Sequence, residues 1–367
     1  MNRVWNARLQ VDLDAIKNNI EKIKETVGDN IDIMPIIKDN AYGTQLNTQI
    51  DFLNELGIRI VGVAIVDEGV YLRKLGYKGE IFVLNQPMKN EIQAIIDNDL
   101  IIGVGSIDFL SELGKYEDRV KIHIEIGTGM GRTGIRPSRI EEYLEEALKY
   151  DNIILDGIYT HFSCSDCDKE YTLKQIESFN SALKFIKEKK INLRYIHACN
   201  SAGIVNFPEA HFNLVRPGII LYGYLPDEEL KHIGLKPSLS LKSQISFLKT
   251  VKCGTGISYG RSFVTQRESK IATVPLGYAD GIRRALSNKG KVVINGQIAP
   301  IVGKVCMDCF MVDVTDIDEV NVGDDVFIWD NKNITVEDIA DIYDTINYEV
   351  MVSISSRVQR EFIGGKS

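Results

Sequence analysis

The chain has 367 residues, of which 44% are hydrophobic, so it can form one large or two ordinary globular domains. Its formal net charge of −8 and the lack of basic blocks interleaved with aromatic residues argue against a nucleic-acid partner and favour a small molecule. No run of eighteen apolar residues is present, and the N-terminus lacks the apolar core of a signal peptide, so we expect a cytoplasmic protein without a membrane partner.

Short apolar runs alternate with helical patterns over the first 225 residues. The runs predict strands at 31–37, 59–65, 80–84, 101–105, 120–126, 154–162, 193–199 and 211–215. Amphipathic stretches between them, such as 138–150 and 171–189, predict helices. Eight βα units favour the α/β class and a (β/α)₈ TIM barrel, whose active site lies at the carboxyl ends of the strands. A doubly wound open sheet is the alternative.

The pattern becomes β-rich near residue 225. Strands are predicted at 238–251, 270–276 and 325–329, and Asn295-Gly296 marks a hairpin turn within 292–298. One helical pattern, 336–343, interrupts them. We therefore predict a barrel domain at 9–228 and a β-strand-rich C-terminal domain at 229–367, which also includes residues 1–8.

Six cysteines include two Cys-x-x-Cys pairs, Cys164/Cys167 and Cys306/Cys309. Together they could make a zinc site, but the pairs lie far apart in sequence, unlike the short spacing of a zinc ribbon. We expect free thiols and no metal.

Lys38 ends the apolar run 33–37 and opens the turn 38–43. Burial at a strand end disfavours the ammonium form and lowers the pKa, which makes a lysine a candidate Schiff-base amine for an aldehyde such as pyridoxal phosphate. Taken alone, the position also fits a lysine that extends from a strand end into water.

Polar residues follow several other predicted strands. Gly129 to Gly134 read G-x-G-x-x-G, but a dinucleotide fingerprint usually opens the first βα unit, whereas this segment follows the fifth strand. Glycines around Arg132 can instead let backbone approach a planar ring while the guanidinium reaches an oxyanion. His161 follows residues 157–160 at the end of the sixth predicted strand, and Asn200-Ser201 and 216–220 follow the seventh and eighth strands. The last of these lies where barrels commonly bind phosphate. These strand ends predict one site.

The chain resembles the bacterial alanine racemases, a barrel-plus-β-domain class of pyridoxal-phosphate enzymes (fold type III), from residue 5 to about residue 362. The motifs that carry the resemblance occur in the family's order, at residues 38–43, 128–134, 197–203, 215–218, 258–260, 277–281 and 306–308.

The resemblance implies an isomerase that interconverts L-alanine and D-alanine, a peptidoglycan precursor, through an aldimine of pyridoxal phosphate. Lys38 and Tyr259 would be the two bases on opposite faces of the substrate, and His161 and Arg216 would stabilise the tyrosine phenolate. Arg216 would also face the pyridine nitrogen. Cofactor contacts are implied for Lys38, Tyr42, Arg132, His161, Asn200, Ser201, Arg216, Gly218, Ile219 and Tyr348, and substrate contacts for Arg132, Met307 and Asp308.

In this family the tyrosine base and the methionine come from the partner subunit. The resemblance therefore implies a homodimer in which Tyr259 and Met307 complete the partner's site.

Three residues depart from the family pattern. Glu125 replaces a lysine whose carbamate braces the motif arginine in many members, and Gly127 and Thr44 replace an aspartate and a histidine. We expect Glu125 to pair directly with Arg132. Tyr348 takes the place of an asparagine found in related serine racemases, which favours alanine as the substrate.

Other functions stay open at this point. They are a serine or broad-specificity racemase, a pyridoxal-phosphate decarboxylase of the same barrel class, and a non-catalytic cofactor-binding protein. The 258–260 motif argues against the decarboxylase, and the β-rich second half argues against the binding protein.

Overall fold

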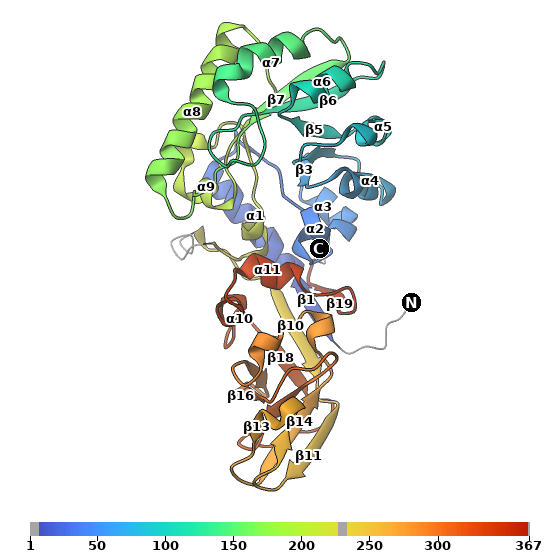
Figure 1. Cartoon of the computed structure of the whole chain (residues 1–367), viewed down its shortest axis with the longest axis vertical. Helices are drawn as coiled ribbons and strands as arrows, with labels where there is room; N and C mark the ends of the chain where they lie inside the picture. The colour runs from blue at the N-terminus through green and yellow to red at the C-terminus, as the bar shows by residue number, and fades with distance from the viewer. Residues whose placement is uncertain (1–6, 227–232, 366–367) are drawn as a thin grey trace. The chain divides into compact units, whose positions relative to one another are not determined.

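The computed structural model describes residues 7–226 and 233–365 (Figure 1). They form two compact units, which we call the barrel unit (Lys17–Ala41 and Gln45–Lys236) and the β-rich unit (Met1–Ile16, Tyr42–Thr44 and Pro237–Ser367). The predicted boundary between residues 228 and 229 lies outside the described residues. No described helix is long and apolar enough to cross a membrane.

The barrel unit contains an eight-stranded parallel sheet in the order β2-β9-β8-β7-β6-β5-β4-β3. Its strands are β2 (Asp32–Ile33), β3 (Ile60–Val63), β4 (Glu80–Val83), β5 (Ile101–Val104), β6 (Val120–Glu125), β7 (Ile153–Tyr159), β8 (Tyr195–His197) and β9 (Leu214–Val215). Each lies within a predicted strand, except that β7 begins one residue before its predicted start. Residues of β3 and β5 are buried throughout, as expected where both faces of a parallel sheet are covered.

The two edges of this sheet meet just beyond β2. Ile36 forms a parallel bridge to Gly62, in which the Gly62 N–H donates to the Pro35 carbonyl and the Ile37 N–H donates to the Gly62 carbonyl, both at 2.8 Å. This link makes the sheet a nearly closed barrel and confirms the predicted barrel over an open sheet.

Helices surround the barrel sheet (Figure 1). They are α1 (Leu13–Val27), α3 (Ile50–Glu55), α4 (Val66–Lys74), α5 (Ile92–Asp97), α6 (Ile107–Leu113), α7 (Ile140–Ala147), α8 (Lys169–Glu188) and α9 (Ser201–Asn206). Side chains of Ser106, Asp168 and Asn200 accept hydrogen bonds from the first-turn N–H groups of α6, α8 and α9. These caps place the helix starts directly after the strand-end loops.

The β-rich unit contains a nine-stranded sheet in the order β11-β14-β17-β16-β15-β18-β10-β1-β19 and a two-stranded sheet, β12-β13. The strands are β1 (Arg8–Asp12), β10 (Leu239–Gln244), β11 (Phe247–Val251), β12 (Gly256–Ile257), β13 (Phe263–Val264), β14 (Ser269–Val274), β15 (Lys291–Ile294), β16 (Gln297–Val302), β17 (Phe310–Asp313), β18 (Asp325–Trp329) and β19 (Gln359–Ile363). The predicted hairpin is confirmed as β15-β16, and its turn residues Asn295 and Gly296 have φ of 50° and 75°.

Two predictions for this unit were wrong. The strand predicted at 238–251 is divided, because Ile245 donates to the Asp324 carbonyl whereas Ser246 donates to the Thr273 carbonyl, so the chain changes partners between them. The helix predicted at 336–343 matches α10 (Val336–Tyr343), but a second helix, α11 (Asn347–Val352), follows it. Six residues are too few to show a helical period in the sequence.

Candidate functional site

The loops after four barrel strands bring polar side chains to one end of the barrel unit. Arg132 lies in the loop after β6, His161 follows β7, Ser201 follows β8, and Arg216 directly follows β9. Lys38 lies beyond β2. Because the carboxyl ends of parallel strands meet at one rim of a barrel, these predicted residues share a rim.

Lys38 begins a turn of unusual backbone geometry. Element α2 (Lys38–Tyr42) is not a right-handed helix, since Asp39, Asn40, Ala41 and Tyr42 have φ between 50° and 57°. The left-handed conformation costs a residue with a Cβ roughly 1–2 kcal/mol. The turn therefore needs support from its surroundings.

Glu68 of α4 supplies part of that support. Its Oε1 accepts a hydrogen bond from the Asp39 N–H at 2.5 Å, and its Oε2 accepts from the N–H groups of Ala64 and Ile65 at 2.7 and 3.3 Å. One carboxylate thus fixes the start of α4 and the start of the lysine turn. The sequence predicted a turn here, but neither its handedness nor the role of Glu68.

The pKa of Lys38 is lowered from its ordinary value. Burial contributes most, and the nearby positive charge of Arg132 adds to it. In a larger fraction of molecules, Lys38 is therefore the neutral, nucleophilic amine.

Arg216 is only 2% exposed and is held by several acceptors. Its Nη2 donates to the carbonyls of Thr160 and Ala198, and its Nη1 donates to His197 Nδ1, all at 2.8 Å. Burial lowers its pKa to about 10, so it remains a cation at neutral pH. Its Nε has no hydrogen-bond partner although it is buried. A buried N–H donor without an acceptor fits a site for an acceptor atom on a ligand.

Three cations act on His161. Burial lowers its pKa well below the ordinary value, and the charges of Arg216, Arg132 and Lys38 lower it further, in that order. The imidazole is therefore neutral at physiological pH. The same result shows that these three predicted site residues gather around His161.

Glu125 does not pair with Arg132, so that prediction was wrong. Its carboxylate is 4% exposed and accepts a hydrogen bond from the Thr133 hydroxyl at 2.6 Å. Among the described residues no ion pair joins Glu125 to Arg132, whose side chain is exposed and acts on Glu125 only as a nearby charge. Burial raises the pKa of Glu125 and outweighs its hydrogen bonds and the nearby arginines. Glu125 therefore holds the arginine loop through its neighbour Thr133.

Asn200, Ser201, Gly218 and Ile219 lie together on adjacent loops of the barrel unit. The Gly218 N–H donates to Ser201 Oγ at 2.9 Å, which joins the loop after β9 to the start of α9. Asn200 Oδ1 caps α9 at Gly203 and also accepts from the Ser165 hydroxyl at 2.7 Å. The Asn200 side chain therefore positions the loop that carries Ser201.

The remaining predicted residues belong to the β-rich unit. Tyr259 and Met307 are 69% and 53% exposed. Their loops are joined by the Ser258 hydroxyl, which donates to the Lys304 carbonyl at 2.6 Å, and the Ala279 N–H donates to the Met307 carbonyl at 3.0 Å. The 258–260, 277–281 and 306–308 motifs thus form one structural group.

Asp308 is part of this group, because Arg357 contacts both Asp308 and Asp280 of the 277–281 motif. Asp308 accepts a hydrogen bond from Arg357 at 2.8 Å. The rings of Tyr42 and Tyr348 lie 6.1 Å apart, centroid to centroid, with Tyr348 on α11. The aromatic pair is therefore formed within the β-rich unit.

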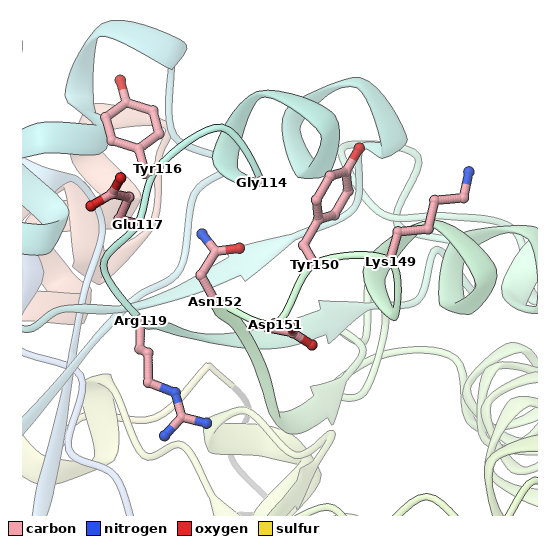
Figure 2. Close-up of a pocket in the computed structure, with 8 residues that line it drawn as sticks. All are labelled: Gly114, Tyr116, Glu117, Arg119, Lys149, Tyr150, Asp151 and Asn152. Carbon is pink, nitrogen blue, oxygen red and sulfur yellow. The ribbon is translucent and has the colours of Figure 1, made fainter.

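The pocket in Figure 2 lies away from the predicted residues. Its volume is about 570 Å³, and its lining comes from the segments before β6 and β7, namely Gly114, Tyr116, Glu117, Arg119 and 149–152. These segments lie at the amino ends of the strands, where barrels rarely place chemistry. The six cysteines are free thiols, and the described residues contain no cluster of potential metal ligands.

Family models match both halves of the chain. The N-terminal domain of alanine racemase matches residues 11–226, and the C-terminal domain of alanine racemase matches residues 238–362. Among curated relatives, the alanine racemase of Halothermothrix orenii is 42% identical over 97% of each chain. That of Methanococcus maripaludis is 39% identical over 96% of this chain and 98% of the relative.

Solved structures agree in fold over nearly the whole chain. The alanine racemase of Clostridium difficile 630 is 33% identical and superposes with a TM-score of 0.94, covering 99% of this chain and 97% of that one. The alanine racemase of Bacillus anthracis with bound L-Ala-P is 35% identical, with a TM-score of 0.93 and coverages of 100% and 97%. The chain belongs to the alanine racemase family.

Proposed function

We propose that this protein is a pyridoxal-phosphate-dependent isomerase that interconverts L-alanine and D-alanine. The observation that carries the proposal is the combination of a lysine of lowered pKa with a fully buried arginine whose Nε lacks a partner, both acting on His161. Pyridoxal phosphate has an aldehyde for such a lysine and an unprotonated ring nitrogen for such a donor. When bound, it withdraws electrons from the substrate and acidifies the α-proton.

The proposed barrel domain, residues 9–228, would hold the cofactor. Lys38 would bind its aldehyde carbon, Arg216 its ring nitrogen and Arg132 its phenolic oxygen. Its phosphate would be held by Tyr42, Ser201, Gly218, Ile219 and Tyr348. The Gly218-Ser201 hydrogen bond supports this assignment, because it joins the two adjacent loops and leaves the Ser201 hydroxyl proton free to donate to a phosphate oxygen.

Racemisation requires one group to remove the α-proton and another to return a proton to the opposite face. Lys38 Nζ would serve one face, because its lowered pKa favours a neutral amine that can accept a proton. The hydroxyl oxygen of the partner subunit's Tyr259 would serve the other. His161 is neutral and so able to accept a hydrogen bond, and Arg216 keeps a positive charge beside it. Met307 and Asp308 would help to place the substrate with Arg132.

A homodimer follows from this proposal. Tyr259 and Met307 are large side chains that lie mostly exposed in one chain, which suits residues that complete a site in a second copy. Light scattering combined with activity measurement tests it. Full activity from a strictly monomeric species would refute the shared site.

Chiral chromatography of L-alanine, L-serine and L-lysine after incubation with the protein and pyridoxal phosphate tests the function. We expect D-alanine to form faster than the other D-enantiomers, and Lys38→Ala to abolish its formation. Racemisation of serine or lysine alone would keep the reaction and change the substrate. Release of carbon dioxide without racemisation would replace the proposed reaction by decarboxylation.

A further inference from the structure

A line of buried polar side chains runs inside the barrel from the rim that carries the site towards its other end. Arg216 Nη1 lies 2.8 Å from His197 Nδ1, and His197 Nε2 lies 2.8 Å from His123 Nδ1. His123 Nε2 then lies 3.4 Å from Asp156 Oδ2, a long but charge-assisted contact. Both histidines are 0% exposed.

The order of donors in this line is determined by its two ends. A guanidinium has only donors and an ionised carboxylate only acceptors. In its observed orientation, the Arg216 guanidinium requires Nδ1 of His197 to be unprotonated, so His197 Nε2–H donates to His123 Nδ1, and His123 Nε2–H donates to Asp156. The guanidinium can turn, whereas the carboxylate at the other end can only accept. Burial lowers the pKa of both histidines, so each imidazole is neutral and carries a single proton.

Asp156 is kept as an acceptor by Arg194. The Nη2 and Nε of Arg194 donate to the two carboxylate oxygens of Asp156 at 2.7 and 3.1 Å, and Nη2 also donates to Glu80 at 2.7 Å. Burial alone would raise the pKa of Asp156, but the hydrogen bonds from His123 and Arg194 outweigh it and lower the pKa. Asp156 is therefore ionised at neutral pH.

Packing holds the planes of the two imidazoles. His123 stacks on Phe82 with centroids 4.6 Å apart, and His197 stacks on Tyr159 at 5.0 Å with an interplanar angle of 6°. Gly157, which pairs with His123 across β6 and β7, leaves room for the ring, because a Cβ there would lie 2.8 Å from His123 Cδ2. With the ring planes held in this way, the direction of the line can reverse through movement of protons alone.

We propose that Asp156, acting through His123, is a positioning residue that fixes the His197 tautomer and thereby orients the Arg216 guanidinium from the far end of the barrel. With Asp156 in place, the unprotonated Nδ1 of His197 holds Nη1 and leaves Nε available for a ligand. If the direction of hydrogen bonding along the line reverses, His197 carries its proton on Nδ1. Two donors then face each other, and the Arg216 guanidinium must turn. The role of Arg216 in catalysis rests on the proposed function, whereas the order of the tautomers does not.

The primary test is ¹⁵N NMR of the protein labelled at histidine, without added cofactor. The chain has five histidines, so assignment by single variants is practical. We expect both His123 and His197 to carry their proton on Nε2. A proton on Nδ1 of His197 in the unmodified protein would overturn the proposal without any variant.

Asp156→Asn is the informative variant, because an amide can donate as well as accept and no longer fixes the direction. It should produce a mixture of tautomers at His197, and Asp156→Glu should restore the single tautomer. His211→Gln is the matched control, since His211 is a buried histidine of the same unit that bonds the Ile204 carbonyl outside this line. If Asp156→Asn does not fold, His123→Phe removes the same link and keeps a ring against Phe82.

Racemisation rates with pyridoxal phosphate give the functional reading. We expect Asp156→Asn to lower kcat by roughly 10-fold, the lower end of the range for residues that orient a reactive group through hydrogen bonds, with rescue by Asp156→Glu. Unchanged His197 tautomers and unchanged kcat, with normal racemisation by the unmodified protein, would refute the positioning role alone. Expected tautomers with no racemisation by any form would instead refute the proposed function.

Discussion

Replacing Glu68 by alanine should loosen the turn that carries Lys38. The substitution removes three hydrogen bonds, two that cap α4 at Ala64 and Ile65 and one to the Asp39 N–H. Loss of the cap costs about 1 kcal/mol. The hydrogen bond from the Asp39 N–H is accepted by a carboxylate but is exposed, so its loss should cost about 1–1.5 kcal/mol. We expect the free energy of unfolding to fall by about 2 kcal/mol.

The loss of the hydrogen bond to the Asp39 N–H weakens the lysine turn itself. If about 1.4 kcal/mol of support for the left-handed turn is lost, the binding constant for pyridoxal phosphate should fall by up to about ten-fold. Denaturant unfolding measures the stability, and titration with the cofactor, followed by its absorbance, measures the binding.

Glu91→Ala is the matched control for Glu68→Ala. Glu91 is also in the barrel unit and accepts a hydrogen bond from a backbone N–H, that of Met88 at 2.6 Å, but makes no contact with the lysine turn. It should cost about 1 kcal/mol of stability and leave cofactor affinity unchanged. Equal cofactor affinities for the two variants would show that Glu68 does not support the turn.

Two further substitutions test other parts of the site. Tyr348→Asn should raise the ratio of serine to alanine turnover, and an unchanged ratio in parallel chiral assays would remove Tyr348 from substrate selection. Burial raises the folded-state pKa of Glu125 above 4.5, so between 4.5 and that raised value the folded state binds more protons than the unfolded state and stability falls as pH rises. Glu125→Gln should therefore flatten the dependence of unfolding free energy on pH and stabilise the protein at neutral pH. Glutamine can still accept the hydrogen bond from Thr133. An unaltered pH dependence in unfolding experiments would contradict the raised pKa of Glu125.

The barrel strands were predictable because their apolar runs are longer than the strands they become, and each run ends at a loop with polar residues. The division of the strand predicted at 238–251 was not predictable, because the residues on both sides of it are apolar enough for one strand. Only the hydrogen bonds of Ile245 to Asp324 and of Ser246 to Thr273 show that the chain changes partners there. Local composition cannot report which strands become neighbours.

The site shows the same division between local and non-local information. Lys38, His161 and Arg216 were identified because each lies at or just beyond the end of a predicted strand, and the structure brings the charges of Lys38 and Arg216 to His161. The left-handed turn was not foreseen, because 39–42 contain no glycine and Glu68, which supports them, is distant in sequence. His123, Asp156 and His197 are polar residues inside predicted strands, and these were the available signals for the buried line.

The central claim is a shared site in which Lys38 of one subunit and Tyr259 of its partner act on alanine. Lys38→Ala and Tyr259→Phe, each inactive as a homodimer, can be produced together in one cell. Random pairing would make half of the dimers mixed, with one intact site in each, so about a quarter of the unmodified rate of D-alanine formation should return. Chiral chromatography of the mixed preparation with L-alanine measures this rate. Activity no higher than that of either variant alone, with mixed dimers present by mass spectrometry, would contradict the shared two-base site.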